Sequence, residues 1–440
     1  MMRRLYSVLI FCLAPFAFAV VLWRGVRDRG YWQGLPERFG WGAKLDGGPT
    51  IWLHAVSLGE MSAAAPLVRA LRTRYPQYAL VLTTGTPTGR ARARGLFIDA
   101  DVRFVPYDTP SAVSRFLDLT RPTLAIIMET ELWPNLFQEC ERRGVPVVLA
   151  SARLSAKSVA RYVRFGDLFR GIFSDNLLLA AQTQEDAERF IAIGAESART
   201  HLVGNIKFDL ELSPGVIDRG HELRAAFGAN RPVWIAGSTH AGEEEQVLAA
   251  HAQLRGAKPE ALLLLVPRHP ERFANVADLL RRQNLRFVRR SLGAANGAAP
   301  AGEAHVVLVD TVGELAALYA AADVAFVGGS LVPIGGHNLL EPAALGLPVL
   351  TGPSYTNGKD IARLLLKQGA ALQVANAAEL AAALRSLLSD PAARQRMGAS
   401  GRQIVAANRG SVRRLLSLIE PLLPDPASLK PAAARPSTGC

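Results

Sequence analysis

Two acidic segments of the N-terminal half contain residue types that suit proton transfer. Glu60 ends the run His54–Glu60 (HAVSLGE), and Glu129 and Glu131 follow directly on the apolar run Leu124–Met128 (LAIIM). A carboxylate that faces a bound substrate can serve as a general base. Glu60 also has a structural interpretation, as a first-turn helix acid stabilised by the helix dipole, and both interpretations stay open. The cluster ETELWPN that follows LAIIM is hard to explain by packing alone, which favours a functional role.

Two cations of the same half follow other apolar runs. Arg153 lies in Ser151–Ser155 (SARLS), and Lys207 lies in Gly204–Asp209 (GNIKFD). Each cation can hold a negative charge on a substrate, or it can form an ordinary surface ion pair of little energetic value. The sequence leaves both interpretations open.

The C-terminal half carries a run that suits a sugar nucleotide. Gly335–Pro342 (GGHNLLEP) combines glycines, which permit close backbone approach, with a helix start whose free N–H groups attract phosphate. Glu341 is badly placed for phosphate but suits ribose hydroxyl groups, although it can also be a helix-dipole acid. Its neighbours His337 and Asn338 favour the ligand interpretation.

Three further segments of this half are candidate ligand contacts. Pro267–Pro270 (PRHP) holds Arg268 and His269 between prolines, which suits either a rigid phosphate or carboxylate contact or a solvated turn. Asp310–Glu314 (DTVGE) is either a backbone contact to a nucleobase or an N-capping Asp followed by a first-turn Glu. Ser238–His240 (STH) either caps an acidic helix start or touches phosphate.

Strand-like apolar runs alternate with amphipathic helical stretches, which predicts an α/β fold of parallel sheets covered on both faces. The first set of predicted strands is Thr50–His54, Ala79–Thr83, Leu124–Met128 and Val145–Ala150. The second set is Val233–Ala236, Ala261–Val266, His305–Val309, Val324–Val327 and Pro348–Leu350. Two doubly wound halves follow, joined near Leu212–Ile217, with ligands expected at the carboxyl ends of the strands.

Length, cysteine content and charge bound the interpretation. At 440 residues the chain exceeds the ~250–300 residues at which one core stops growing, which predicts two domains. Only Cys12, Cys140 and Cys440 occur, too few for a disulfide framework, which suits a reducing compartment. The net charge of +12 favours an anionic partner, and no nucleic-acid-binding motif occurs, so a membrane surface or a phosphorylated acceptor is expected. No Asp-x-Asp motif or metal-ligand spacing occurs, so neither a metal nor another cofactor is predicted.

The N-terminal segment Leu5–Trp23 is uncharged, is about as long as a membrane-spanning helix and is flanked by arginines. Pro15 is expected to kink it. A signal peptide cleaved after Ala17–Ala19 and an interfacial helix are the alternatives. The apolar run continues beyond Ala19 and then meets an arginine cluster, which favours an uncleaved anchor that leaves the rest of the chain in the cytoplasm.

The basic linker after this anchor either binds the membrane beside the active-site cleft or only sets the topology; it contains Arg24, Arg27, Arg29 and Arg38. Gly293–Gly302 is predicted to be a low-complexity surface loop. The predicted divisions are therefore an anchor at 1–23, domains at 24–213 and 214–423, and a disordered tail at 424–440.

Eight segments, in this order, resemble the bacterial 3-deoxy-D-manno-octulosonic acid (Kdo) transferases of lipopolysaccharide synthesis, glycosyltransferase family 30. They are HAVSLGE, TTGTPTG, METELWPN, ARLS, VGNIKFD, VPRHPERF, DTVGEL and FVGGSLVPIGGHNLLEP. The resemblance implies a GT-B fold, with two Rossmann-like domains facing a central cleft. It also implies an inverting transfer of Kdo from CMP-Kdo to the lipid A precursor lipid IVA, at the cytoplasmic face of the inner membrane. The chain departs from the family at Ser151, where Asn is frequent, and in its longer tail.

Residue roles follow from the resemblance position by position. It makes Glu60 the general base and assigns Glu129 and Lys207 to transition-state stabilisation. The CMP contacts that it implies are Pro267, Arg268, Val312, Gly313, Glu314, Asn338, Leu339, Leu340 and Glu341. The expected partners are CMP-Kdo, a phosphorylated lipid A precursor and the membrane, with no nucleic acid and no metal.

Two rival functions remain open. One is another GT-B sugar-nucleotide enzyme, such as a UDP-sugar transferase or epimerase, which protection by CMP but not UDP would exclude. The other is a non-catalytic membrane-bound protein that binds a sugar nucleotide or lipid. The presence of both Glu60 and Glu129 argues against a non-catalytic protein.

Overall fold

The computed structural model describes residues 2–45, 47–164, 166–295 and 304–424, which form two compact units. Unit 1 contains the chain up to Asp209 and the segment from Asn408 onward, and unit 2 is Leu210–Ala407. Each unit is described by itself. Residues 296–303, which hold most of the predicted low-complexity loop, lie outside the described residues, as does the predicted tail beyond Pro424.

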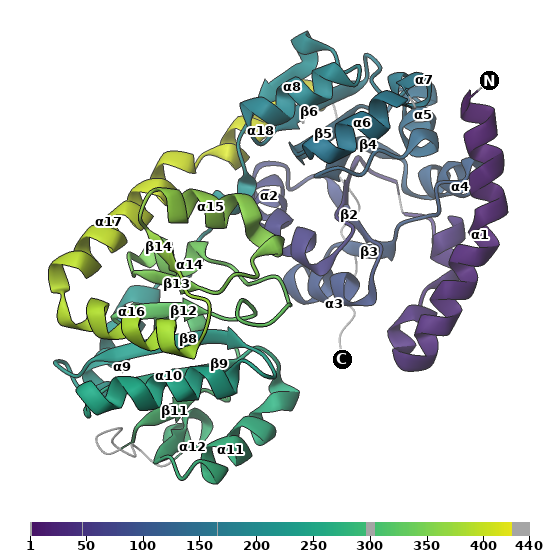
Figure 1. Cartoon of the computed structure of the whole chain (residues 1–440). Helices are drawn as coiled ribbons and strands as arrows, with labels where there is room; N and C mark the ends of the chain where they lie inside the picture. Colours follow the sequence, from purple (N-terminus) through teal and green to yellow (C-terminus); the bar gives the residue numbers. More distant parts are fainter. Residues whose placement is uncertain (1, 46, 165, 296–303, 425–440) are drawn as a thin grey trace. The chain divides into compact units, whose positions relative to one another are not determined.

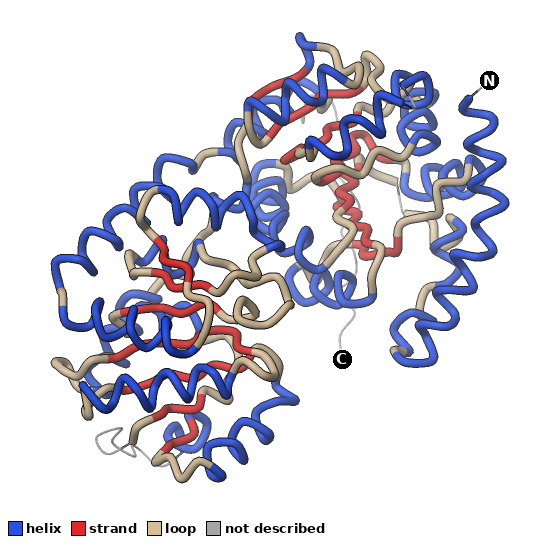
Figure 2. The backbone as a smooth tube through the Cα atoms, viewed as in Figure 1, coloured by secondary structure: helices blue, strands red, loops and turns tan. Residues whose placement is uncertain are grey.

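Unit 1 is built on a parallel sheet with the strand order β3-β2-β1-β4-β5-β6-β7. The strands are drawn as arrows in Figure 1 and in red in Figure 2. Its strands are β1 (Thr50–His54), β2 (Ala79–Thr84), β3 (Asp101–Phe104), β4 (Pro122–Met128), β5 (Val147–Ala152), β6 (Leu177–Ala181) and β7 (Thr200–Leu202). Its α-helices are α1 (Met2–Arg27), α2 (Leu58–Arg74), α3 (Pro87–Leu96), α4 (Pro110–Thr120), α5 (Pro134–Arg142), α6 (Ala156–Arg164), α7 (Gly166–Arg170), α8 (Gln184–Ala192) and α18 (Ser411–Ile419). Its 3-10 turns are η1 (Arg29–Trp32), η2 (Leu35–Phe39), η3 (Ser197–Arg199), η4 (Ile206–Asp209) and η7 (Glu420–Leu422).

Helices cover both faces of this sheet, as the sequence predicts. Successive strand residues point to opposite faces, so Ile51 and Leu53 pack with α2, α3 and α18, whereas Trp52 packs with α4, α5 and α8. All three side chains are fully buried.

Unit 2 repeats the architecture with the strand order β10-β11-β9-β8-β12-β13-β14. Its strands are β8 (Val233–Thr239), β9 (Leu262–Pro267), β10 (Phe287–Arg289), β11 (Val306–Leu308), β12 (Val324–Val327), β13 (Val349–Thr351) and β14 (Ala371–Gln373). Its helices and turns are α9 (Val216–Phe227), α10 (Glu244–Ala257), η5 (Pro270–Arg272), α11 (Phe273–Arg282), α12 (Arg290–Ala295), α13 (Leu315–Ala320), α14 (Leu340–Leu345), η6 (Thr356–Gly358), α15 (Lys359–Lys367), α16 (Ala377–Ser389) and α17 (Pro391–Asn408). Trp234 packs on one face with α10, α11 and α16, and Ile235 packs on the other with α9 and α13.

Five strands have no counterpart among those predicted. Four of them, β3, β7, β10 and β14, are the edge strands of the two sheets. These strands have only three or four residues, so they lack a long apolar run. Most side chains of β7, β10 and β14 are partly or fully exposed, whereas β3 (DVRF) is largely buried but alternates charged and apolar residues. The fifth, β6 (LLLAA), has no β-branched residue and reads equally well as a buried helix segment.

The predicted C-terminal domain 214–423 is wrong at its end, because α18 belongs to unit 1. Leu415 and Ile419 of this helix are fully buried in the unit 1 core beside α2. The apolar period of α18 indicates an amphipathic helix but does not say which sheet it covers. The boundary between the units lies after Asp209, before the predicted linker.

The predicted N-terminal apolar helix is present as α1, which continues through Pro15 as one helix. Arg4–Arg27 is long and apolar enough to cross a membrane, and Phe11 and Phe16 are 67% and 71% exposed. The helix also contacts unit 1: the Tyr6 hydroxyl donates to Asp108 at 2.8 Å, and the Phe18 and Phe39 ring centroids are 5.3 Å apart.

The basic linker is only partly available to a membrane. Arg38 is 5% exposed, its guanidinium lies over the Phe104 ring, and it donates to the Gly85 carbonyl. We therefore correct its assignment as a membrane contact. Arg24, Arg27 and Arg29 remain exposed.

Candidate active site

Each sheet has a point where the strand order reverses. In unit 1 the order turns back between β1 and β4, and in unit 2 between β8 and β12. Doubly wound sheets bind ligands beyond the carboxyl ends of the strands at this point. The segments after β1 and β4 therefore hold the candidate site of unit 1, and the segments after β8 and β12 hold that of unit 2.

Glu60 lies in the first turn of α2, directly after β1. Ser57 caps this helix, since its Oγ accepts the Glu60 N–H at 3.3 Å, and Glu60 Oε2 accepts the Val56 N–H at 2.8 Å. The interpretation of Glu60 as a first-turn helix acid is therefore confirmed, and it does not conflict with a role as a base. Burial raises the pKa of this half-buried carboxyl to about 7; the Val56 N–H opposes the increase, and the charges of Glu129 and Glu131 add to it. A carboxyl group with such a pKa can act as a base near neutral pH.

Glu129 follows β4 and lies between two cations. Lys207 Nζ is 3.2 Å from its Oε1, and Arg153 Nε is 3.9 Å from its Oε2. The electrostatic influence of Lys207 also reaches Glu60. The structure thus brings Glu60, Glu129 and Lys207 together at the carboxyl edge of one sheet, with Arg153 beside them.

Lys207 is held in place by the C-terminal helix of unit 1. It lies in the short turn η4, where its N–H donates to Asn205 Oδ1 at 3.0 Å. Asp209, at the end of the turn, accepts the N–H groups of Gly410 and Val412 at 2.5 and 2.6 Å, at the start of α18. The sequence around Asp209 does not predict this role, because its partners Gly410 and Val412 lie about two hundred residues further along the chain.

The rest of the ETELWPN cluster has a packing explanation. The Trp133 ring lies 5.3 Å from the ring of the buried His54. Asn135 is also buried, and its Nδ2 donates to the Asp108 carbonyl at 2.6 Å while its Oδ1 accepts the Ser7 hydroxyl. Of this cluster, only the carboxylates of Glu129 and Glu131 therefore remain candidates for a functional role.

In unit 2, sequence analysis missed the residue that shapes the glycine loop after β12. The fully buried Glu243 accepts the N–H groups of Gly329, Ser330 and Leu331 at 2.7 to 3.0 Å. These N–H groups are thus occupied by a carboxylate of the protein. In the sequence, Glu243 is marked only by the acidic run GEEE after Ser238–His240, and this run by itself predicts no more than the start of a helix.

The predicted run Asn338–Glu341 includes the start of α14, and its residues form hydrogen bonds with one another. Asn338 Oδ1 accepts the Leu340 N–H at 3.0 Å, and Asn338 Nδ2 donates to Glu341 Oε1 at 3.2 Å. Asn338 is exposed, whereas the side chains of Leu339 and Leu340 are buried, so these two leucines can meet a ligand only through their backbone.

The other predicted nucleotide contacts lie at the ends of β9 and β11. Pro267 is the buried last residue of β9, and the exposed Arg268 follows, with its N–H bonded to the Thr239 carbonyl at 3.0 Å. Val312 is 79% exposed and Gly313 is also exposed, so a ligand can reach this segment from solvent. Glu314 is bound by Arg290 at 2.9 Å.

Two other observations concern ligands. Among the described residues no group of three His, Cys, Asp or Glu side chains could hold a metal ion.

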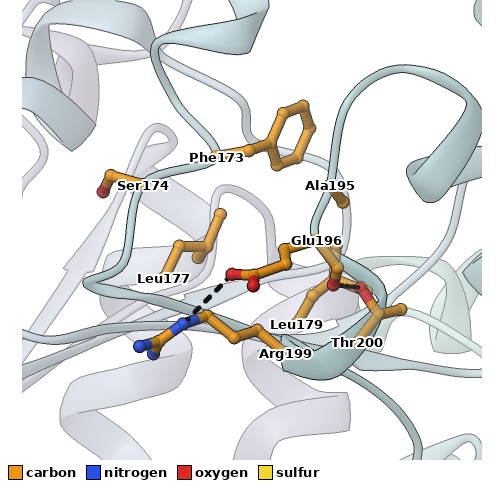
Figure 3. A pocket seen from close by; sticks show the side chains of 8 residues that line it. All are labelled: Phe173, Ser174, Leu177, Leu179, Ala195, Glu196, Arg199 and Thr200. Atoms are coloured by element: carbon orange, nitrogen blue, oxygen red, sulfur yellow. Dashed lines mark hydrogen bonds and ion pairs between the residues drawn. The ribbon is translucent and has the colours of Figure 1, made fainter.

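A small hollow in unit 1 is lined by Phe173, Leu177 and Leu179, with a Glu196–Arg199 ion pair of 3.4 Å at its rim (Figure 3). It contains none of the predicted site residues.

Comparison with known proteins decides the family. The sequence profile of the 3-deoxy-D-manno-octulosonic-acid transferases (kdotransferases) matches residues 33–210, and that of glycosyl transferases group 1 matches residues 301–404. The chain is 40% identical to a 3-deoxy-D-manno-octulosonic acid transferase of Haemophilus influenzae, across 96% of this chain and 99% of that protein. This chain belongs to the Kdo transferase family. A second Kdo transferase, from Bordetella pertussis, is 39% identical across 95% of this chain and 99% of its own length.

Solved structures confirm the fold. UDP-GlcNAc 2-epimerase from Neisseria meningitidis, bound to UDP-GlcNAc, superposes with a TM-score of 0.54 over 84% of this chain and 100% of its own, at 12% identity. At that identity the likeness concerns the two-domain α/β fold alone. As a Kdo transferase, the chain is a glycosyltransferase with two Rossmann-like units, and the two carboxylates and the lysine of unit 1 are its candidate chemical groups.

Proposed function

We propose that this Kdo transferase moves Kdo from CMP-Kdo to a phosphorylated lipid A precursor, with inversion at the anomeric carbon. The acceptor hydroxyl oxygen bonds to the anomeric carbon while the bond from that carbon to the phosphate oxygen breaks. CMP leaves with the electron pair, and the hydroxyl proton passes to a base. Kdo transferase relatives that match nearly the whole chain support this donor sugar.

Glu60 is the proposed base. The observation that carries this role is a half-buried carboxyl with a pKa of about 7, next to a Glu129–Lys207 pair at the strand-order reversal. At neutral pH a large fraction of Glu60 is ionised, and it is basic enough to take the hydroxyl proton. Lys207 and Glu129 are proposed to stabilise the charge that develops in the transition state.

CMP is proposed to bind unit 2, at Pro267–Arg268, Val312–Glu314 and Asn338–Glu341. Arg268 is an exposed cation at a strand end, which supports contact with the single phosphate of the donor. The reaction is proposed to need no divalent ion, because one phosphate can be neutralised by side chains and backbone N–H groups.

We further propose that α1 holds the enzyme at the inner membrane, with both units on the cytoplasmic side. An exposed apolar helix with Arg24 and Arg27 in its last turn and Arg29 just beyond it supports attachment to an anionic bilayer, from which a lipid acceptor must emerge.

The test is transfer itself. Purified chain is incubated with freshly made CMP-Kdo and lipid IVA, and the product is analysed by mass spectrometry, which also counts the Kdo residues added. Glu60→Gln is expected to keep CMP affinity and to lower turnover by roughly 10²- to 10⁴-fold, because the base is lost. Glu188→Gln, an exposed carboxylate of α8, is the matched control. Substantial turnover by Glu60→Gln would remove Glu60 from its role.

A UDP-sugar enzyme, the rival that the sequence left open, shares only the fold with this Kdo transferase. Competition decides between the two: protection against proteolysis by CMP but not by UDP excludes it, and the reverse result would overturn the proposed donor.

A further inference from the structure

Two histidines meet at the strand-order reversal of unit 2. His240 follows β8 and His337 lies in the loop after β12; their Nε2 atoms are 2.7 Å apart, and their rings are within 8° of parallel. The His269 ring stands nearly perpendicular to that of His240, at 5.3 Å between centroids. Gly329 makes room for the pair, because a Cβ there would lie 3.1 Å from the His337 ring.

The short Nε2–Nε2 distance limits how many protons the pair can carry. One nitrogen must donate its N–H to the lone pair of the other. A single added proton preserves this hydrogen bond and gives both rings an N–H on Nδ1. A second added proton would set two N–H groups against each other and break the contact. The pair is therefore able to take up one proton without rearrangement.

Cations face the pair, and the nearby carboxylates are already engaged. Burial lowers the pKa of both histidines, that of His337 to about 4, and the charges of Arg268 and His269 add to this for each; Arg272 acts on His240 as well. Both imidazoles are therefore neutral at pH 7 in the free protein.

Three carboxylates lie close by, and each has a partner. Glu243 accepts four backbone N–H groups, Glu244 is bound to Arg272 at 3.0 Å, and Glu271 lies 3.9 Å from His269. The pair is half-buried and neutral and faces Arg268, and an anionic ligand would supply the negative charge that favours protonation of the pair.

We propose that the His240–His337 pair takes up one proton when the phosphate of the sugar nucleotide binds beside it, and that this proton stabilises the departing phosphate. The inference rests on the proposed function, since it needs a donor with a single phosphate. A bound anion favours the charged form of a neighbouring imidazole. The phosphate gains negative charge as its bond to the anomeric carbon breaks, so an imidazolium hydrogen bond strengthens in the transition state.

Calorimetry can count the proton. Cytidine 5′-(methyl phosphate) is a suitable probe, because a phosphodiester does not titrate near neutral pH. Its binding to the full chain in detergent micelles is measured at pH 7.5 in buffers of different ionisation enthalpy. We expect uptake of about one proton per bound ligand, and an affinity that rises as the pH falls from 8.5 to 6.5.

Variants assign the proton. His337→Gln and His240→Gln are each expected to abolish the uptake and to weaken binding roughly 10- to 100-fold, because a charge-assisted hydrogen bond is lost. His221→Gln, an exposed histidine of α9, is the control and should behave as the wild type. Should a variant fail to fold, imidazole ¹⁵N shifts of the labelled wild-type chain give the same answer, since binding must protonate two coupled histidines.

The possible results are distinct. Binding of the cytidine probe without proton uptake, or with uptake that persists in both variants, overturns the pair's role and leaves the proposed function intact. Uridine 5′-(methyl phosphate) is titrated in parallel, and binding of this uridine probe in place of the cytidine probe overturns the proposed function itself.

Discussion

At the scale of single residues, the candidate sites of the two units are each marked by backbone conformations that residues other than glycine rarely adopt. Glu129, Ser151 and Ser238 have φ values of 57°, 52° and 60°, and each lies at the carboxyl end of a central strand. Ser151 and Ser238 coincide with register irregularities in β5 and β8. Each such conformation costs of order 1–3 kcal/mol and persists only where surrounding contacts enforce it. We infer that the carboxylate of Glu129 is held in a fixed direction, between Lys207 and Arg153.

The pH dependence of catalysis tests the coupling between Lys207 and Glu60. Glu60 must be ionised to act as a base, so kcat/KM is expected to fall as the pH drops below about 7. Lys207 lowers the pKa of Glu60, so Lys207→Met should raise it and shift this acid limb upward by less than about one pH unit. The shift is measured on the residual activity, with Lys258→Met, in unit 2, as the control. A downward shift would contradict the arrangement.

At the scale of elements, a C-terminal helix completes a site built from the N-terminal half. The turn η4 carries Lys207, and α18 fixes it through the two N–H groups bound by Asp209 and through Arg414, whose Nε donates to the Val203 carbonyl at 2.8 Å. A change in α18 can therefore reach Lys207 without touching any ligand.

Removal of the Asp209 cap is expected to affect both stability and turnover. Asp209→Ala leaves the first N–H groups of α18 without their acceptor, which should cost about 1–2 kcal/mol of unfolding free energy. Turnover should fall more than CMP affinity, because η4 loosens while unit 2 is untouched. Denaturant unfolding, kcat and the Kd for CMP are measured together. Asp175→Ala, at an exposed turn of unit 1, is the control, and equal losses in kcat and CMP affinity would contradict the local role.

At the scale of the whole molecule, α1 is the proposed membrane attachment, and it packs on the rest of unit 1. Its exposed aromatic side chains suit lipid, yet Tyr6 and Ser7 near one end donate to Asp108 and Asn135, and Phe18 contacts Phe39 further along. A helix that keeps these contacts runs along the protein body. This arrangement favours the interfacial alternative over a helix that crosses the bilayer away from unit 1.

Deletion of residues 2–27 tests the attachment. The full chain is expected to stay with anionic membranes in about 1 M salt, where charge attraction is screened and apolar burial remains. The deleted chain should bind weakly and be released by salt, because only basic residues such as Arg29 are left. Sedimentation with vesicles measures both, and retained CMP binding shows that unit 2 is folded. Salt-resistant binding of the deleted chain would place the apolar attachment elsewhere.

The sequence alone determined the α/β class, every inner strand except β6, the apolar N-terminal helix and the segments that carry chemistry. Central parallel strands are buried on both faces and so appear as continuous apolar runs, such as Leu124–Met128. Edge strands such as β10 and β14 are short and largely exposed, so they form no such run and were not predicted.

Only the tertiary structure decided which residues act together. Four contacts join segments that are far apart in the chain. They are the Lys207–Glu129 ion pair, the hydrogen bonds from α18 to Asp209, those from the glycine loop to Glu243, and the His240–His337 hydrogen bond. Local patterns report burial and backbone preference, whereas these partners depend on strand order and on distance in space. The raised pKa of Glu60 has the same origin, because burial and neighbouring charges exist only in the folded chain.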